Sequence, residues 1–169
     1  MDNRIKNTDK DKNNDLYEVC ENKCMFGWSL LVDEKQVDSN KNIIKMVTKN
    51  GESIGMIKLY NLDNINKHAY INVISFDNAD LVALKKSIVS ILQYAFDELD
   101  LNKIYSAYLP SQVEIDRFWG SMGFVHEGTF RNHIFLNNEF CNVEVKSIFK
   151  HEFNRTFSSE KKAECIYNR

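Results

Sequence analysis

The chain has 169 residues, of which 43% are hydrophobic and 12% aromatic, and its formal net charge is −2. This length and composition suit one domain with its own core. Basic residues are scattered among acidic ones, and no apolar run approaches the ~20 residues that span a bilayer, so we expect neither a nucleic-acid partner nor a membrane partner.

The N-terminal residues and the cysteines indicate the compartment. Residues 1–15 are polar and charged, so they cannot form the apolar part of a secretory signal, and we expect a disordered lead-in. Cys20 and Cys24 lie close together, but neither they nor Cys141 and Cys165 have a second Cys or His pair at zinc spacing. We therefore expect reduced thiols in a cytoplasmic protein, and no metal site.

The first half of the chain predicts three strands in succession. Residues 43–49 and 52–60 flank Asn50-Gly51, which is a strong hairpin signal because both turn positions take positive φ. Residues 69–76 carry β-branched and aromatic side chains on a period of two. Residues 16–32 are apolar enough to pack, but the type of this segment stays open.

A helix, a strand and a second helix follow. From Leu81 to Leu99 the apolar period becomes three and four residues, which predicts a helix with Asp80 at its N-cap. Residues 103–109 return to alternation and predict a strand. Residues 112–122 predict another helix, and Gly123 fits the position just past its end.

The C-terminal part predicts a second hairpin. Residues 129–136 and 141–149 flank Asn137-Asn138, again a candidate for positive φ. The predicted order is β-β-β-α-β-α-β-β, with a strand–helix–strand unit among antiparallel strands. This order implies an α/β domain on a mixed sheet. We place the domain at residues 16–153 and a polar tail at 154–169.

Four stretches are more specific than this order of elements. They are ESIGMIKL at residues 52–59, AYIN at 69–72, YAFDELDLNKI at 94–104, and MGFVHEGTFR at 122–131, which NHIFL follows. Together they resemble the GNAT acyltransferases, and among them the Rim-type group that acetylates protein N-termini, polyamines and nucleotide-sugar amines. The resemblance implies the GNAT fold over residues 43–153. It also implies acetyl-CoA as co-substrate and a small-molecule or peptide amine as acceptor.

The resemblance places the co-substrate on the central helix and on the strand before it. Backbone N–H groups at a helix start bind pyrophosphate, because amide donors and the helix dipole both favour anions there. A splayed strand holds the thioester carbonyl, and a polar residue after the next strand orients the ligands. The implied positions are Ile74, Phe76, Leu81, Val82, Ala83, Leu84 and Ser111.

The phosphate loop departs from the family pattern, which is an Arg/Gln-x-x-Gly-x-Gly/Ala run. Residues 79–84 contain no glycine although the loop length is kept, so Leu81 and Val82 make close approach of the backbone to phosphate harder. Asp77 and Asp80 add two carboxylates beside the anion site. An N-capping Asp80 would accept the same N–H groups that pyrophosphate needs.

The catalytic positions differ as well. Ser111 stands where the family has an Asn, and Trp119 stands where it has the Tyr that acts as acid toward the thiolate. An indole N–H donates a hydrogen bond but does not release its proton, and packing in the core is the alternative for Trp119. Glu127 is the best-placed carboxylate for a base, with a surface loop as the alternative. The acceptor groove would be bordered by Tyr70, Arg131 and His133, unless these side chains only pair across the sheet.

Three functions remain open from the sequence. The first is an acetyl-CoA-dependent N-acyltransferase with an unusual cofactor loop, since transfer to a positioned amine can survive the loss of an acid. The second is a GNAT-fold module that binds or regulates without catalysis. The third is an acyltransferase that takes its acyl group from a carrier protein. The oligomeric state is also open, with a homodimer among the choices.

Overall fold

The computed structural model describes residues 42–76 and 79–157. The expected lead-in at 1–15 and the apolar segment at 16–32 lie outside the described residues. So do Asp77, residues 158–169 of the expected tail, and three of the four cysteines, Cys20, Cys24 and Cys165.

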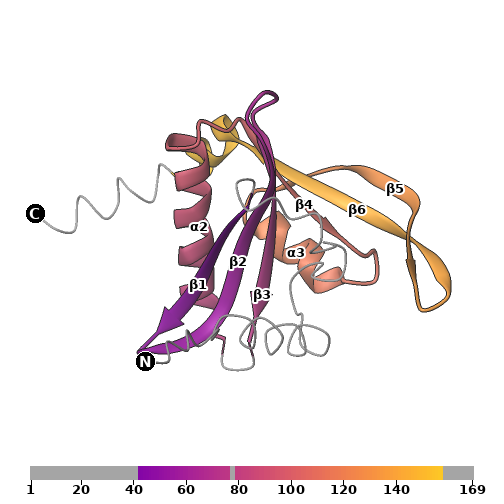
Figure 1. Cartoon of the computed structure of the whole chain (residues 1–169), viewed down its shortest axis with the longest axis horizontal. Coiled ribbons are helices and arrows are strands. Elements are labelled where there is room, and N and C mark those ends of the chain that lie inside the picture. Colours follow the sequence, from indigo (N-terminus) through magenta and orange to yellow (C-terminus); the bar gives the residue numbers. More distant parts are fainter. Residues whose placement is uncertain (1–41, 77–78, 158–169) are drawn as a thin grey trace, which may run out of the picture.

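Within these described ranges, six strands form one mixed sheet in the order β1-β2-β3-β4-β6-β5. Figure 1 shows the sheet with the β5–β6 hairpin extending to one side. In chain order the elements are β1 (Ile43–Lys49), β2 (Glu52–Asp63), β3 (His68–Ser75), α2 (Leu81–Asp97), β4 (Lys103–Tyr108), α3 (Val113–Ser121), β5 (Val125–Leu136) and β6 (Glu139–Phe149). This is the order that the sequence predicts, so the mixed α/β sheet is confirmed.

The strand directions and turns also follow the sequence prediction. β3 and β4 are parallel and are connected through α2, whereas the other neighbouring strands are antiparallel. Asn50 and Gly51 have φ values of 53° and 86°, and Asn137 and Asn138 have 51° and 65°. Positive φ at both central positions matches the right-handed twist of the strands, so both predicted hairpin turns are confirmed.

The described helices pack on one face of the sheet. On this face Leu84 of α2 lies against Gly55 of β2, and the Tyr108 hydroxyl of β4 donates to Asp116 of α3. Alternate residues of β3 and β4 point the same way, as the strand period requires. The core between α2 and the sheet contains Leu59, Ala69, Ile71, Val73, Leu84, Ile88, Leu92, Phe96 and Ile104.

β5 begins earlier than its alternation predicts, at Val125 instead of Thr129. Two irregularities in its pairing with β6, at His126/Gly128 and at Phe130/Ile134, disturb the period of two. Gly123, at φ 84°, ends the turn after α3, and the buried Phe124 leads the chain directly into the sheet. His126 and Glu127 are therefore strand residues, and the surface-loop alternative is wrong.

A helix covers residues 150–157 and continues across the position where the sequence analysis separates domain from tail. Phe153 is buried, and its ring contacts those of Phe96 in α2 and Phe157, with centroids 5.3 and 4.9 Å away. Two aromatic side chains within a polar stretch thus attach this segment to the core.

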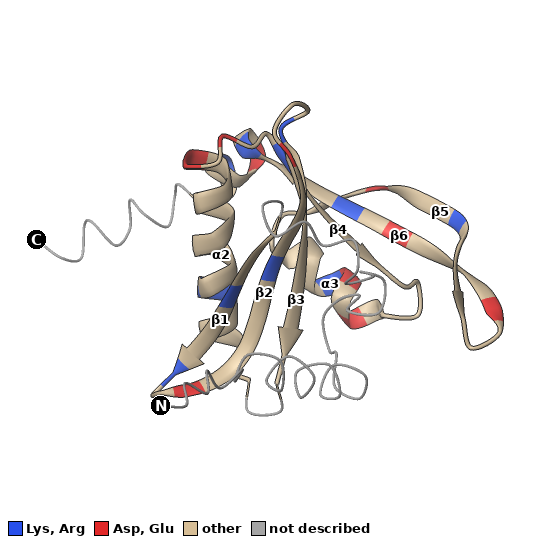
Figure 2. Cartoon of the chain, in the orientation of Figure 1, with Lys and Arg blue, Asp and Glu red and all other residues tan. Residues whose placement is uncertain are grey.

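Charged side chains of both signs are interspersed along the described strands and helices, as Figure 2 shows. None of the described helices has the length and apolar character needed to cross a membrane.

Candidate active site

β3 and β4 pair over only three residues and then diverge. His68, Ala69 and Tyr70 pair with residues 103–105, whereas β3 continues to Ser75 and β4 to Tyr108. Figure 1 shows the two strands separating toward their C-terminal ends. We call residues 71–75 and 106–108 the splay. No described strand pairs with this edge of β3, and unpaired backbone N–H and C=O groups at a strand edge can bind an extended ligand.

Asn72 is a buried polar side chain in the β3 half of the splay, as is Ser75. It is 6% exposed, and its Oδ1 atom has no hydrogen-bond partner among the described residues. A buried acceptor without a donor is costly, so such an atom indicates a place for a ligand donor. Of the predicted cofactor positions nearby, Ile74 is buried opposite Met56, and the Phe76 N–H donates to the Ile54 carbonyl at 3.1 Å.

The start of α2 carries its own anion. One carboxylate oxygen of Asp80 accepts the N–H groups of Val82 at 2.8 Å and Ala83 at 3.1 Å. The other oxygen pairs with the ammonium of Lys49 at the end of β1. The predicted N-cap is confirmed, and the carboxylate accepts two of the N–H groups that a pyrophosphate would need.

The same contacts keep Asp80 ionised. The hydrogen bond from Lys49, followed by those from the backbone, lowers the pKa of Asp80 to about 2. Leu81 and Val82 are 47% and 64% exposed beside it. Leu84 is a core residue whose N–H donates to the Asp80 carbonyl as the first intrahelical bond. The predicted cofactor positions at this helix start thus surround a carboxylate.

The two lysines of the next turn lie close to this carboxylate in sequence. Lys85 Nζ donates to Ser121 Oγ at 3.4 Å and lies 5.7 Å from the centre of the Phe118 ring, so it connects α2 with α3. Lys86 is exposed.

Trp119 lies in the core of α3. It is 1% exposed, and its ring is 5.2 and 4.6 Å from the rings of Phe118 and Phe124. Its indole Nε1 has no hydrogen-bond partner among the described residues. Trp119 follows Asp116 by about one helical turn, so both residues lie on the same side of α3, and Asp116 accepts the hydroxyl of Tyr108 at the end of β4.

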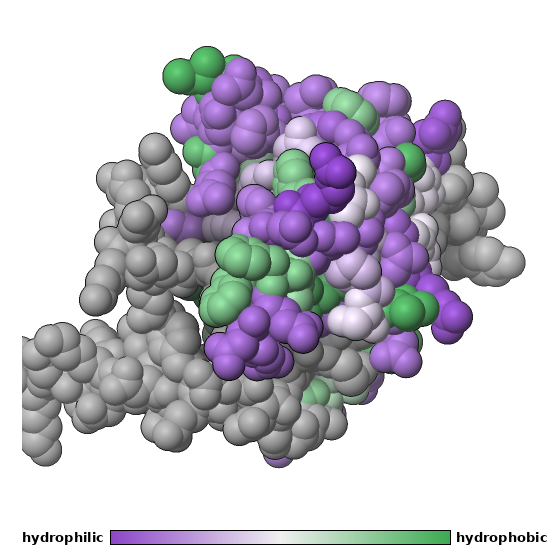
Figure 3. All heavy atoms as spheres, turned by 90° about the vertical axis from the view of Figure 1, so that its right-hand side faces the viewer, coloured by the Kyte–Doolittle hydropathy of each residue, from purple (hydrophilic) through white to green (hydrophobic). Residues whose placement is uncertain are grey.

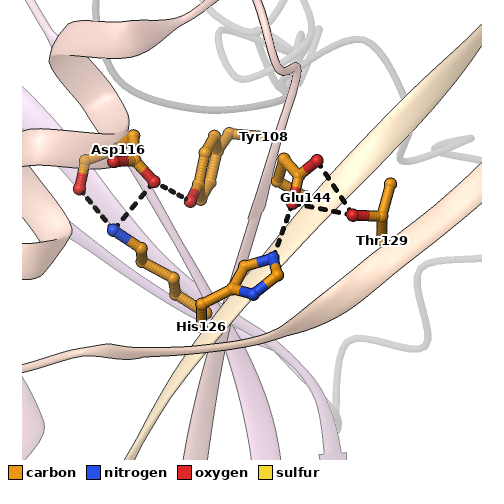
Figure 4. A network of polar contacts seen from close by, with 6 residues as sticks. Tyr108, Asp116, His126, Thr129 and Glu144 are labelled. Carbon is orange, nitrogen blue, oxygen red and sulfur yellow. Dashed lines mark hydrogen bonds and ion pairs between the residues drawn. The ribbon is translucent and has the colours of Figure 1, made fainter.

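A polar network connects α3, β4, β5 and β6, and Figure 4 shows its side chains converging. Asp116 accepts hydrogen bonds from the Tyr108 hydroxyl at 2.5 Å and, at 2.8 Å, from the ammonium of Lys146. Lys146 also donates to the Asp116 carbonyl. Its ammonium, followed by the Tyr108 hydroxyl, lowers the pKa of Asp116. Burial, followed by the hydrogen bond to Asp116, raises the pKa of Tyr108 above its usual value.

The other half of this network is centred on Glu144, which is opposite Tyr108 in the sheet. Glu144 accepts from Thr129 Oγ1 at 2.9 Å and is 2.7 Å from His126 Nε2. Tyr108 and Glu144 thus place a phenol and a carboxylate at the end of β4.

Glu127 lies at the other end of β4. It accepts a hydrogen bond from Ser147 Oγ at 2.5 Å and pairs with Lys103 at 2.9 Å. Both contacts, with Ser147 first, lower its pKa. Ser147 pairs with Tyr105 in the sheet, three residues before Tyr108, which corresponds to roughly 10 Å along the strand.

Tyr70 belongs to a row of aromatic rings on the sheet face opposite α2. Its ring is 5.5 Å from that of Tyr60 and stacks on that of Tyr105 at 5.2 Å, while His68 meets Tyr105 edge-on. Burial raises the pKa of Tyr70. This row lies beside the splay, and its rings are half-buried.

The remaining predicted residues lie farther out. Arg131 and His133 are exposed in the irregular part of β5, beyond the end of the pairing between β4 and β6. Ser111 is exposed in the turn between β4 and α3. The hairpin also exposes the rings of Phe130, Phe135 and Phe140. Figure 3 views the molecule from the hairpin side and shows apolar patches among polar surface.

The described residues include no group of three or more His, Cys, Asp or Glu side chains that could hold a metal ion. Cys141, the cysteine that the structure describes, is a free thiol.

Sequence reasoning missed Lys49, Tyr108, Asp116 and Lys146. Asp116 precedes Trp119 by three residues and so borders the apolar stripe of its helix, which is a weak sign that its carboxylate faces inward. Lys49 directly precedes the Asn50-Gly51 turn, and nothing local connects it with Asp80, 31 positions away.

Comparison with known proteins supports the same interpretation. The model of the acetyltransferase (GNAT) domain matches residues 30–143. The Bacillus subtilis (strain 168) protein YdaF, whose name assigns it provisionally as a ribosomal N-acetyltransferase, is 26% identical over 106 residues. That match covers 61% of this chain and 57% of the relative, so it spans less than two thirds of the relative's length.

Solved structures share the fold. A spermidine N-acetyltransferase SpeG mutant from Vibrio cholerae matches with a TM-score of 0.67 at 21% identity, over 86% of this chain and 79% of that one. The Vibrio cholerae spermidine N-acetyltransferase in complex with CoA and spermine matches with a TM-score of 0.64 at 20% identity, over 85% and 76%. Since the family model spans more than half of the chain, this protein belongs to the GNAT acetyltransferase family.

Proposed function

We propose that the protein transfers an acetyl group from the thioester of acetyl-CoA to a primary amine. The observation that carries this proposal is the splay, where no described strand pairs with the edge of β3 and the buried Oδ1 of Asn72 has no partner within residues 42–76 and 79–157. An extended pantetheine arm is a chain of amides, and it fits an open strand edge as an added strand would.

The transfer exchanges one bond to the acetyl carbon for another. The neutral amine attacks the thioester carbonyl, a C–N bond forms, and the C–S bond breaks. The amine loses a proton to a base, and the thiolate gains one from solvent or an acid, so the products are an amide and a thiol.

Two buried polar atoms that lack a partner among the described residues could form hydrogen bonds with the donor arm. The Asn72 Oδ1 atom would accept an amide N–H of the arm, and the Trp119 Nε1–H would donate to the sulfur that becomes thiolate. An indole can stabilise this charge by a hydrogen bond but cannot protonate it, so water supplies the proton. We assign Trp119 this role.

The other end of the donor fits less well. The pyrophosphate would meet the Asp80 carboxylate where it needs free N–H groups. The nucleotide end of the donor would touch only the side chains at the start of α2, those of Leu81, Val82 and Ala83. Ile74 and Phe76 lie before this helix, at the end of β3. We therefore expect weak binding of acetyl-CoA.

For the acceptor, we propose a small-molecule or peptide amine that lies on the face of Tyr70. Glu127 would take the amine proton through solvent, because its distance from the splay prevents direct contact, and its lowered pKa makes it a weak base. Arg131 and His133 would meet only an acceptor long enough to reach the hairpin. The related structures include spermidine N-acetyltransferases, so polyamines belong among the acceptors to test.

The test is release of free thiol from acetyl-CoA in the presence of spermidine, a nucleotide-sugar amine, or a peptide with a free N-terminus. Mass spectrometry would identify the acetylated product. We expect turnover with one of these classes. Thiol release that does not depend on an amine, or its absence with all three while a GNAT control is active, would contradict the proposal.

A second candidate function is a binding module without catalysis. The specific observation that favours it is the Asp80 carboxylate, which accepts the amides of the anion site. A folded protein that binds neither acetyl-CoA nor any other acyl donor in calorimetry would favour this module over the enzyme.

A further inference from the structure

The proposed donor site has two parts, the start of α2 for the phosphates and the edge of β3 for the pantetheine arm. They differ in whether their hydrogen-bonding groups are already occupied. An α-helix leaves its first four N–H groups without intrahelical partners, and these groups bind phosphate. In α2, two of the four, those of Val82 and Ala83, donate to the Asp80 carboxylate. Only those of Asp80 and Leu81 have no partner among the described residues.

Charge reinforces this difference. Lys49 pairs with Asp80 at the helix start and so neutralises the carboxylate that is already present. Because its pKa is about 2, Asp80 does not lose its charge by protonation near neutral pH. A phosphate group arriving here would have to displace a bound anion that is part of the chain.

The half that would hold the donor arm has the opposite property. The edge of β3 along residues 71–75 has no described strand partner. The Asn72 side chain is more than nine-tenths buried, and no donor in the described part of the chain reaches its acceptor. These groups suit the amides and thioester of a pantetheine arm.

We infer that this protein recognises its acyl donor by the pantetheine arm and leaves the nucleotide end unbound, so that its donor class is acyl-pantetheine thioesters in general. The inference rests on the proposed acyl transfer. The chemistry is unchanged: the acceptor nitrogen forms a bond to the acyl carbon, the C–S bond breaks, and the pantetheine sulfur leaves as a thiol.

Such an arm has two natural sources, free CoA and a phosphopantetheine group attached to a carrier protein. Both present the same amides and thioester, and they differ only beyond the phosphate. The experiment must therefore compare donors that share the arm and differ in the group attached to its far end.

The test is calorimetric titration of the full chain with acetyl-CoA, with S-acetylpantetheine, and with adenosine 3′,5′-bisphosphate. We expect the Kd values of acetyl-CoA and S-acetylpantetheine to agree within about threefold. We expect no binding of adenosine 3′,5′-bisphosphate. An amide cradle that formed two charge-assisted bonds to phosphate would instead separate the two thioesters by about 100-fold or more.

A matched pair of variants isolates Asp80. Asp80→Gly frees the two amides and removes the charge, so it should create a preference for acetyl-CoA over S-acetylpantetheine. Asp100→Asn removes the same charge three residues past the end of α2, where Asp100 pairs with Lys67, and should leave the ratio unchanged. Circular dichroism checks that both variants keep the fold.

The outcomes separate the inference from the function on which it rests. Acetyl-CoA that binds the unaltered chain at least ~30-fold more tightly than S-acetylpantetheine would overturn the inference and leave the acetyltransferase standing. Binding of neither thioester would overturn both. If the kcat/KM for an acetyl-loaded carrier protein exceeds that for S-acetylpantetheine, the inference is supported and the carrier is the source of the arm. If the kcat/KM for acetyl-CoA equals that for the loaded carrier, the inference is supported and free CoA is a source as well.

Discussion

Lys49, the last residue of β1, pairs with Asp80, the N-cap of α2, across 31 positions of sequence. The pair ties the β1–β2 hairpin to the point where a GNAT enzyme would bind pyrophosphate. Because the carboxylate also accepts two backbone N–H groups, three donors hold one anion at this place.

Removing this anion should improve donor binding. We expect Asp80→Gly combined with Val82→Gly to strengthen acetyl-CoA binding at least ~10-fold, since the freed amides gain charge-assisted bonds to phosphate. The two glycines lower helix propensity, so the Tm should fall while the affinity rises. Calorimetry measures the affinity. Tight binding by the unaltered chain that Lys85→Ala with Lys86→Ala abolishes would show instead that these lysines bind the phosphates.

The same carboxylate predicts a pH dependence of stability. The folded pKa of Asp80, about 2, is below the ordinary 3.8, so its contribution is present above the unfolded pKa and is lost as pH falls through the folded pKa. Asp80→Asn keeps a capping oxygen but does not titrate. Urea midpoints should therefore be higher for the unaltered chain at pH 7, and the difference should shrink from about pH 4 downward. A constant difference between pH 7 and pH 2 would contradict the assignment.

Local sequence signals were sufficient for much of this arrangement. The Asn50-Gly51 and Asn137-Asn138 turns, the Asp80 N-cap and the turn at Gly123 each depend on neighbouring residues, and each is confirmed. β5 was harder to delimit, because its irregular pairing hides the alternation between Val125 and Thr129.

Contacts between distant segments could not be predicted in this way. Lys49 with Asp80, and Lys146 with Asp116, join elements whose distance depends on the whole sheet. The resemblance predicted a splayed strand in general terms. That Asn72 would be buried there, with no partner in the part of the chain that the structure describes, followed only from the packing around β3.

The ion pair between Lys146 and Asp116 predicts that replacing either partner has an unequal effect on stability. Lys146 is nearly buried, with 11% of its side chain exposed, whereas Asp116 is 46% exposed. Asp116→Ala leaves a buried ammonium with only a carbonyl partner and should lower the free energy of unfolding by about 2–3 kcal/mol. Lys146→Met leaves a carboxylate that water can reach and should cost under about 1 kcal/mol. Urea denaturation at pH 7 measures both, and equal losses would contradict this account.

Asn72 predicts opposite effects on stability and binding. Asn72→Leu removes a buried acceptor that has no partner among the described residues, so it should stabilise the free protein by about 1 kcal/mol. The same change removes the proposed acceptor for the donor arm and should weaken binding of S-acetylpantetheine about 10-fold. Thermal denaturation and calorimetry give the two values. If Asn72→Leu is less stable than the unaltered chain and binds S-acetylpantetheine equally well, Asn72 has a structural role and does not contact the donor.

Trp119 offers a test of how the leaving thiolate is stabilised. Trp119→Phe keeps an aromatic ring in the core but loses the Nε1–H donor, so kcat should fall about 10-fold while the KM for the donor changes little, because this hydrogen bond strengthens as the thiolate forms. Trp119→Tyr introduces a phenol that can release a proton. It should raise kcat above that of the unaltered chain and add a decline at high pH near the phenol pKa of ~10.

Phe124→Leu is the matched control, because it disturbs the ring contact at 4.6 Å without touching a donor. If it lowers Tm and leaves kcat unchanged while Trp119→Phe lowers kcat, the indole acts on the reaction. If both variants change only Tm, Trp119 is a core residue and the leaving group depends on water alone.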